Sequence, residues 1–247
     1  MKKIVALIAF FSLVVIMVSA QGEVRFGFQL SPTFGWMSTD DNKIRSNGTN
    51  LGLKLGMVGE YYFQENYSIT SGIGFFFNAG GTLRHDLVGE YWRNTVAEDE
   101  LPSVCSASFK STAPNLKYSI QYVEIPVGLK MRTREFGYIR YFFEPQVGFG
   151  FRTQARGDVK NEGDECSDIN IQKDVGLLNM FWGVNGGIEY SVSESTSLVG
   201  GLGMQFGFTD ATKDDDLQYR DNDVLKSVAE DSKGVIRAFV IRLGVMF

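Results

Sequence analysis

Few residues of this chain are suited to acid–base or nucleophilic chemistry. His85 is the only histidine, which excludes a metal site made of several imidazoles. A serine–histidine pair would have to use this residue, but no serine adjoins it, and Leu83-Arg84-His85-Asp86 is typical of a polar loop. The sequence has no phosphate loop, nucleophile elbow or dinucleotide fingerprint. We therefore expect a protein that is not an enzyme and has no catalytic residue, cofactor or resident metal, with catalysis through His85 as the lesser alternative.

An acidic segment near the C-terminus is the second place to consider. Its carboxylates are Asp210, Asp214, Asp215, Asp216, Asp221, Asp223, Glu230 and Asp231. Oxygen ligands at this density suit calcium, but the spacing lacks the EF-hand pattern and its glycine. We favour a solvated acidic loop that keeps away from anionic lipid or meets it through divalent cations.

Along the segments that must position these residues, apolar side chains recur at every second residue. In the last segment Phe239, Ile241 and Leu243 fall on one face, whereas Arg242 and Gly244 fall on the other. Such alternation predicts a β-strand. Eight strands are expected, at Val24–Met37, Asn50–Phe63, Tyr67–Ala79, Tyr118–Arg132, Gly137–Arg152, Gly176–Ser191, Thr196–Phe208 and Gly234–Phe247.

Tight and long connections alternate between these strands. The long, polar ones are 38–49, 80–117, 153–175 and 209–233. This pattern is typical of an up-and-down barrel in an outer membrane, with both chain ends on the short-turn side and the long loops outside the cell. The sequence thus predicts an all-β fold, an eight-stranded, closed, antiparallel transmembrane β-barrel.

The two faces of the strands differ in bulk. One face carries large apolar residues such as Phe26, Phe28, Phe75 and Trp182, too many for the narrow interior of an eight-stranded barrel, so we expect it to contact lipid. The other face mixes glycines with charges, and parity places nine charged residues in the lumen: Arg25, Lys54, Glu60, Glu124, Lys130, Arg140, Glu144, Glu189 and Arg242.

Acids and bases interleave in this set, so we expect a filled, salt-bridged lumen in which Glu124 pairs with a base such as Lys130 or Arg140. A filled lumen argues against a diffusion pore, which needs more strands. An ion or proton path along the buried charges is the functional alternative to structural pairing.

The first twenty residues indicate the compartment. Lys2 and Lys3 precede an apolar run that ends in Val18-Ser19-Ala20, the pattern of a cleaved signal peptide, which leaves residues 21–247 for the barrel. Without the two lysines, 22 basic residues remain against 29 acidic ones, a formal charge of −7. That sign argues against nucleic acid as a partner.

Cys105 and Cys166 are the only thiols. Strand parity places both in long loops on the outward side, after the third and fifth strands. An oxidising envelope compartment favours a disulfide between them, which would tie the two loops together.

Two neighbouring strands carry a family resemblance. Residues 122–130 (YVEIPVGLK) and 143–150 (FEPQVGFG) resemble the paired Y-x-E-I-P and P-x-x-G-x-G strands of the PorT-like outer-membrane β-barrel family, and 28–35 (FQLSPTFG) is similar as well. Small barrels of the OmpX kind are a more distant resemblance. Membership would imply an outer-membrane protein, often a partner within a larger envelope assembly such as secretion machinery.

These observations favour binding or assembly over chemistry. The first hypothesis is a structural or accessory subunit of an envelope complex, with other outer-membrane or periplasmic proteins as partners. The alternative is a free-standing surface barrel whose loops serve adhesion or protection, and a lipid- or peptide-modifying enzyme comes third. In each case outer-membrane lipid and lipopolysaccharide would surround the wall.

Overall fold

The computed structural model describes residues 22–86, 91–96, 114–160, 165–213, 218–221, 224–227 and 232–247. The expected signal peptide, residues 1–20, lies outside this part of the chain and stays a prediction. No helix within the described ranges is long and apolar enough to cross a bilayer.

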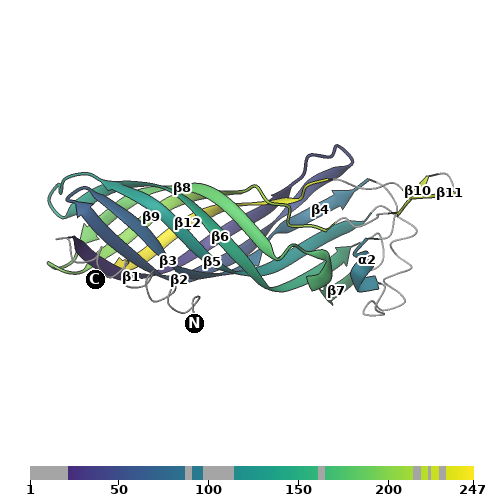
Figure 1. The fold of residues 1–247 in the computed structure, drawn as a ribbon, viewed down its shortest axis with the longest axis horizontal. Coiled ribbons are helices and arrows are strands. Elements are labelled where there is room, and N and C mark those ends of the chain that lie inside the picture. The colour runs from purple at the N-terminus through teal and green to yellow at the C-terminus, as the bar shows by residue number, and fades with distance from the viewer. Residues whose placement is uncertain are drawn as a thin grey trace, which may run out of the picture.

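Eight long strands form the body of the molecule. They are β1 (Glu23–Ser38), β2 (Ile44–Gln64), β3 (Tyr67–Ala79), β5 (Asn115–Arg132), β6 (Ile139–Lys160), β8 (Leu178–Ser191), β9 (Ser197–Gly207) and β12 (Val235–Met246). Each pairs antiparallel with the next in this order. The last strand, β12, pairs with β1 and closes the ring. The predicted eight-stranded antiparallel barrel is confirmed, and Figure 1 shows its tilted strands side by side.

The two ends of the barrel differ. At the turn end, on the left of Figure 1, short connections join β2 to β3, β5 to β6 and β8 to β9. The opposite end, the loop end, carries four short elements: β4 (Gly81–His85), helix α2 (Arg93–Val96), β7 (Glu165–Asn170) and the 3-10 turn η1 (Gln172–Asp174). A separate hairpin follows β9, made of β10 (Gln218–Asp221) and β11 (Val224–Ser227).

Three strands continue beyond their predicted ends, where the sequence was expected to form loops. The first residues of β2 pair with β4, with Ile44 opposite His85, and the last residues of β6 pair with β7, with Lys160 opposite Glu165. Between them, the start of β5 pairs with both β4 and β6. Ladder hydrogen bonds need no apolar side chains, so the polar composition concealed these strands. We name this sheet, β4 and β7 with residues 44–49, 115–120 and 153–160, the extension.

The outer wall of the ring is apolar, as the sequence predicted. Large side chains on it are exposed, among them Phe26 at 61 % and Leu51 at 67 %. Near the turn end Phe136 and Tyr138 are also exposed. An apolar band edged by aromatic residues is the surface that a barrel presents to lipid and to its interface with water.

The interior is apolar towards the loop end, a feature that was not predicted from the sequence. One buried cluster there includes Met37, Ile44, Phe76, Leu83, Tyr91, Trp92, Leu116, Tyr118, Ile120, Tyr122 and Ile236. Trp92 enters it from the long connection between β4 and β5, with its ring edge-on to Tyr118 at 5.6 Å between centroids. Gly157 makes room for this ring, because a Cβ there would lie 2.4 Å from Trp92 Cη2. The loop connection therefore contributes to the core of the barrel.

Candidate functional site

The charged side chains of the lumen lie between this apolar cluster and the turn end. Eight of the nine residues assigned to the lumen are no more than 7 % exposed: Arg25, Lys54, Glu60, Glu124, Lys130, Glu144, Glu189 and Arg242. Arg140 is the exception, since its side chain is 27 % exposed. It lies close to the β5–β6 turn, where the lumen opens to solvent, and so belongs to the mouth instead of the buried set.

The layer of charges nearest the apolar cluster joins β2, β5 and β9. Lys54 Nζ lies 2.6 Å from Glu124 Oε2. Gln205 completes the layer, because its Nε2 donates to Glu124 Oε1 at 3.0 Å while its own Oε1 accepts from Lys54. The lysine ammonium also lies 4.4 Å from the centre of the Phe76 ring. Every charge in this layer therefore has a partner.

Glu124 does not pair with Lys130 or Arg140, contrary to the sequence-based expectation. Lys130 lies six positions along the same strand, about 20 Å away at the usual rise of ~3.3 Å per residue. Arg140 pairs with Glu135 at 2.5 Å in the mouth. Parity assigns a residue to a face of its strand, but pairing depends on the level that each residue reaches along the barrel axis.

A second ion pair joins β12 to β6. Arg242 Nη1 lies 2.5 Å from Glu144 Oε2, and the Thr70 hydroxyl donates to the other oxygen of Glu144 at 3.1 Å. Both oxygens of this carboxylate are therefore hydrogen-bonded, as a charge buried in a narrow interior requires.

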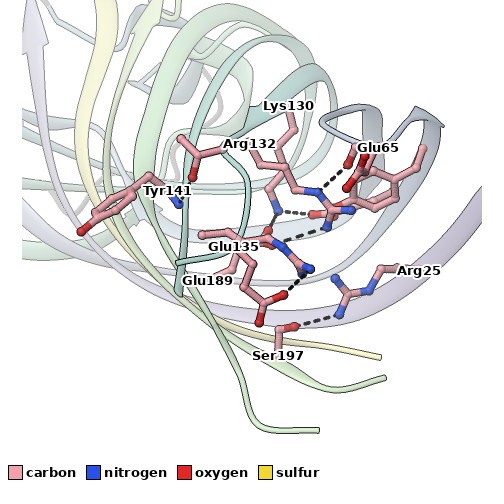
Figure 2. Close-up of polar contacts among 12 residues, drawn as sticks. Arg25, Glu65, Lys130, Arg132, Glu135, Tyr141, Glu189 and Ser197 are labelled. Carbon is pink, nitrogen blue, oxygen red and sulfur yellow. Dashed lines mark hydrogen bonds and ion pairs between the residues drawn. The ribbon is translucent and has the colours of Figure 1, made fainter. Parts of the chain in front are cut away.

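The third layer lies closest to the turn end and is the densest. Lys130 Nζ contacts Glu60 Oε1 at 2.6 Å and also contacts Glu189. The Tyr62 hydroxyl donates to Glu60 Oε2 at 2.5 Å. Arg132 stacks on the Tyr62 ring at 3.9 Å and lies 3.9 Å from Glu189. Figure 2 shows Lys130, Arg132 and Glu189 gathered at this level, with Arg25 reaching Ser197.

Three functional members of these layers were missed from the sequence. Arg132 continues the alternation of Glu124 and Lys130 along β5, so parity was sufficient to find it. Gln205 and Tyr62 were missed because they carry no formal charge and the prediction considered only charged residues. Their roles follow only from the register that places them beside Glu124 and Glu60.

His85 is buried in the extension, 6 % exposed, and is not a polar loop residue as the sequence suggested. Its ring packs against Tyr91 at 4.4 Å between centroids, and neither ring nitrogen has a hydrogen-bond partner among the described residues. Burial lowers the pKa of His85 to about 4, although Asp41 and Asp86 oppose this shift. The imidazole is therefore neutral at pH 7.

Cys105 and most of the acidic segment lie outside the described residues. The bridge between Cys105 and Cys166 therefore stays a prediction. Asp210 is described, and its Oδ1 accepts from the backbone of Thr212 and Gly234, both at 3.0 Å, which is a structural role. Within the described ranges, no group of three or more histidine, cysteine or acidic side chains is arranged to hold a metal ion.

A closed antiparallel ring with an apolar outside and ion pairs inside defines a membrane-embedded β-barrel. The chain belongs to the family described as outer membrane protein beta-barrel domain, whose model matches residues 19–213. The protein is therefore an outer-membrane protein.

Solved structures of other outer-membrane proteins are similar to this chain. Neisserial surface protein A is 9 % identical, with a TM-score of 0.44 over 90 % of this chain and 95 % of that one. A major outer membrane protein of Thermus thermophilus is 13 % identical, with a TM-score of 0.44 over 91 % and 99 %. OprG of Pseudomonas aeruginosa is 12 % identical, with a TM-score of 0.41 over 91 % and 94 %. No curated protein matches by sequence. These similarities are too low to assign a function.

Removal of a lumen carboxylate tests the ion-pair layers. Replacement of Glu124 by Ala leaves Lys54 buried without its carboxylate, which we expect to lower the free energy of unfolding by about 3 to 5 kcal/mol. The control is Lys117→Ala, which breaks a partly exposed pair with Asp158 at 3.1 Å in the extension and should cost about 0 to 1 kcal/mol. Urea unfolding in detergent measures both, and an equal effect of the two substitutions would contradict the layer.

The burial of His85 predicts a pH dependence at the loop end. Since its folded pKa of about 4 lies below the ordinary 6.5, the stability it contributes is complete above pH 6.5 and is lost as the pH falls towards 4. The protection factors of the β4 amides, which correct for the intrinsic exchange rate at each pH, should therefore fall as the pH is lowered over that interval. The variant His85→Phe should lack this response, and an unchanged pH profile in the variant would refute the assignment.

Proposed function

We propose that the protein is a free-standing, non-conducting surface barrel that acts by presenting its extension to a partner outside the cell. The closed lumen is the observation that carries this proposal. The lumen is crossed by three layers of paired charges and is then filled by an apolar cluster that includes Trp92. Such an interior leaves the outer surface of the loop end as the part that can meet a partner outside the cell.

The form of the extension supports a presenting role. Its strands are continuous with barrel strands β2, β5 and β6, and its inward side packs on the apolar cluster through Leu83, Leu116 and Val159. Its outward side carries polar pairs such as Arg45 with Asp86 at 2.9 Å. A rigid, polar sheet that projects from a membrane anchor is suited to adhesion or to protection of the surface.

The absence of catalysis is part of the proposal, and the surroundings of His85 support it. A general base needs a hydrogen-bonding partner and access to substrate, and the imidazole of His85 has neither a partner among the described residues nor exposure.

An accessory subunit of an envelope complex is the second candidate. The resemblance to the PorT-like family favours it, and the two strands that carry that resemblance are neighbours, with Ile125 opposite Phe149. Glu124, the acid of this motif, belongs to an ion-pair layer of the lumen, so the motif accounts for a folded barrel as well as for membership in a complex.

Conductance tests the closed lumen. Protein reconstituted in a planar bilayer should show no steady large conductance, because ion pairs and apolar side chains fill the interior. Stable channels of porin size would refute the proposal.

The mass of the native particle separates the two candidates. Extraction from the membrane in a mild detergent, followed by native mass spectrometry, should yield a single barrel if the protein acts alone. A stable species that contains a second protein would favour the accessory role and overturn the free-standing one.

A further inference from the structure

Arg25 is a buried charge without a carboxylate partner. The residue is 6 % exposed, and both hydrogen bonds of its guanidinium come from Nη2, to Ser197 Oγ at 2.9 Å and to the Ser195 carbonyl at 3.4 Å. No carboxylate of the described residues lies within ion-pair distance of it. Burial of an unpaired charge is unfavourable, so this position requires explanation.

The nearest acids are already engaged. Glu60 is the cross-strand neighbour of Arg25, but its two oxygens accept from Lys130 and Tyr62. In the lumen as described, five buried cations face four carboxylates. The cations are Arg25, Lys54, Lys130, Arg132 and Arg242, and the acids are Glu60, Glu124, Glu144 and Glu189. Arg25 is the one of these five cations that has no carboxylate partner.

A pocket of about 460 Å³ lies beside Arg25 in the turn-end mouth. Arg132 also lines it, and its side chain is only 8 % exposed. Its Nη1 lies 3.9 Å from Glu189 Oε2 and makes no hydrogen bond among the described residues. Ser191, Ser193 and Ser197 line the same space. The lining of the pocket therefore includes two buried arginine side chains and three serines.

The acidic residues of this pocket do not neutralise Arg25. Glu135 is held by Arg140 at 2.5 Å, and Glu23 and Glu194 are exposed at the rim. The buried part of the pocket is therefore positive, while its negative groups face water.

We propose that Arg25, Arg132 and Ser197 form a binding site for a phosphate group at the periplasmic mouth of the barrel. Guanidinium groups bind phosphate through charged hydrogen bonds, and donors from several directions suit a tetrahedral oxyanion. The pocket is larger than a phosphate ion, so it accommodates the rest of a phosphorylated small molecule or lipid headgroup. The orientation follows the rule that short turns of such barrels face the periplasm.

Thermal unfolding in a phosphate-free glucoside detergent tests the site, with inorganic phosphate as the probe at constant ionic strength. The unfolding midpoint of the wild-type protein should rise with phosphate concentration. The Arg25→Gln variant should lose this rise or need at least about tenfold more phosphate. Arg45→Gln removes one positive charge at the loop end and should keep the wild-type response. No rise in the wild type, or an equal rise in Arg25→Gln, would overturn the proposal.

A second variant separates the loss of phosphate binding from a loss of folding. Arg25→Met removes the unpaired charge and should be at least as stable as the wild type without phosphate, yet insensitive to it. Lower stability in phosphate-free detergent would show that the chain itself balances Arg25 and would overturn the site. In phosphatidylglycerol vesicles, a wild-type midpoint that no longer responds to added phosphate would identify the lipid headgroup as the source, whereas a persistent response would identify a soluble phosphate.

Discussion

The seam between β1 and β12 joins the two ends of the barrel domain inside the membrane, where water cannot satisfy the backbone. It runs from the pairing of Gly27 with Met246 to that of Ser38 with Val235, and Phe26 and Phe247 exchange backbone hydrogen bonds at 3.2 and 2.7 Å. Because this seam leaves no open edge, every other strand has two partners and a fixed register. A shift of one residue would turn the charged face towards lipid, so the seam determines which residues can meet in the lumen.

The lumen is filled by two kinds of side chain, charged ones in the turn half and apolar ones towards the loop end. In the turn half, the ring is lined by glycines and long polar residues, and each carboxylate lies at the same level as a base from a different strand, as with Lys54 and Glu124. Towards the loop end, the interior changes to rings and aliphatic groups around Tyr118 and Tyr122, and this apolar region needs no charge matching. Arg25 lies at the turn end of the charged half and has no carboxylate partner among the described residues.

Sequence alone predicted the faces of the strands, because alternation depends only on the strand itself and not on its neighbour. Lys54 and Glu124 were thus placed inside, but their pairing was not foreseen, since it depends on the shear between strands. The apolar cluster was also missed. Met37 and Ile236 lie near the ends of predicted strands and Trp92 lies in a predicted loop, so the sequence does not show that the three meet. β4 was missed for a related reason, since its five residues are too few to show a period.

The length of β6 has a mechanical consequence. Its 22 residues, at about 3.3 Å each, give a strand of about 70 Å, and a tilt of about 40° leaves a height of about 55 Å against a hydrocarbon layer of about 30 Å. The part that projects continues the hydrogen-bonded pairing of β6 with β5 in the membrane, across one register irregularity between Gln121 and Tyr122 where the two parts meet. Anything held by the extension would therefore stay at a set height and angle above the bilayer, and a lateral force on it would be transmitted to the barrel as a torque.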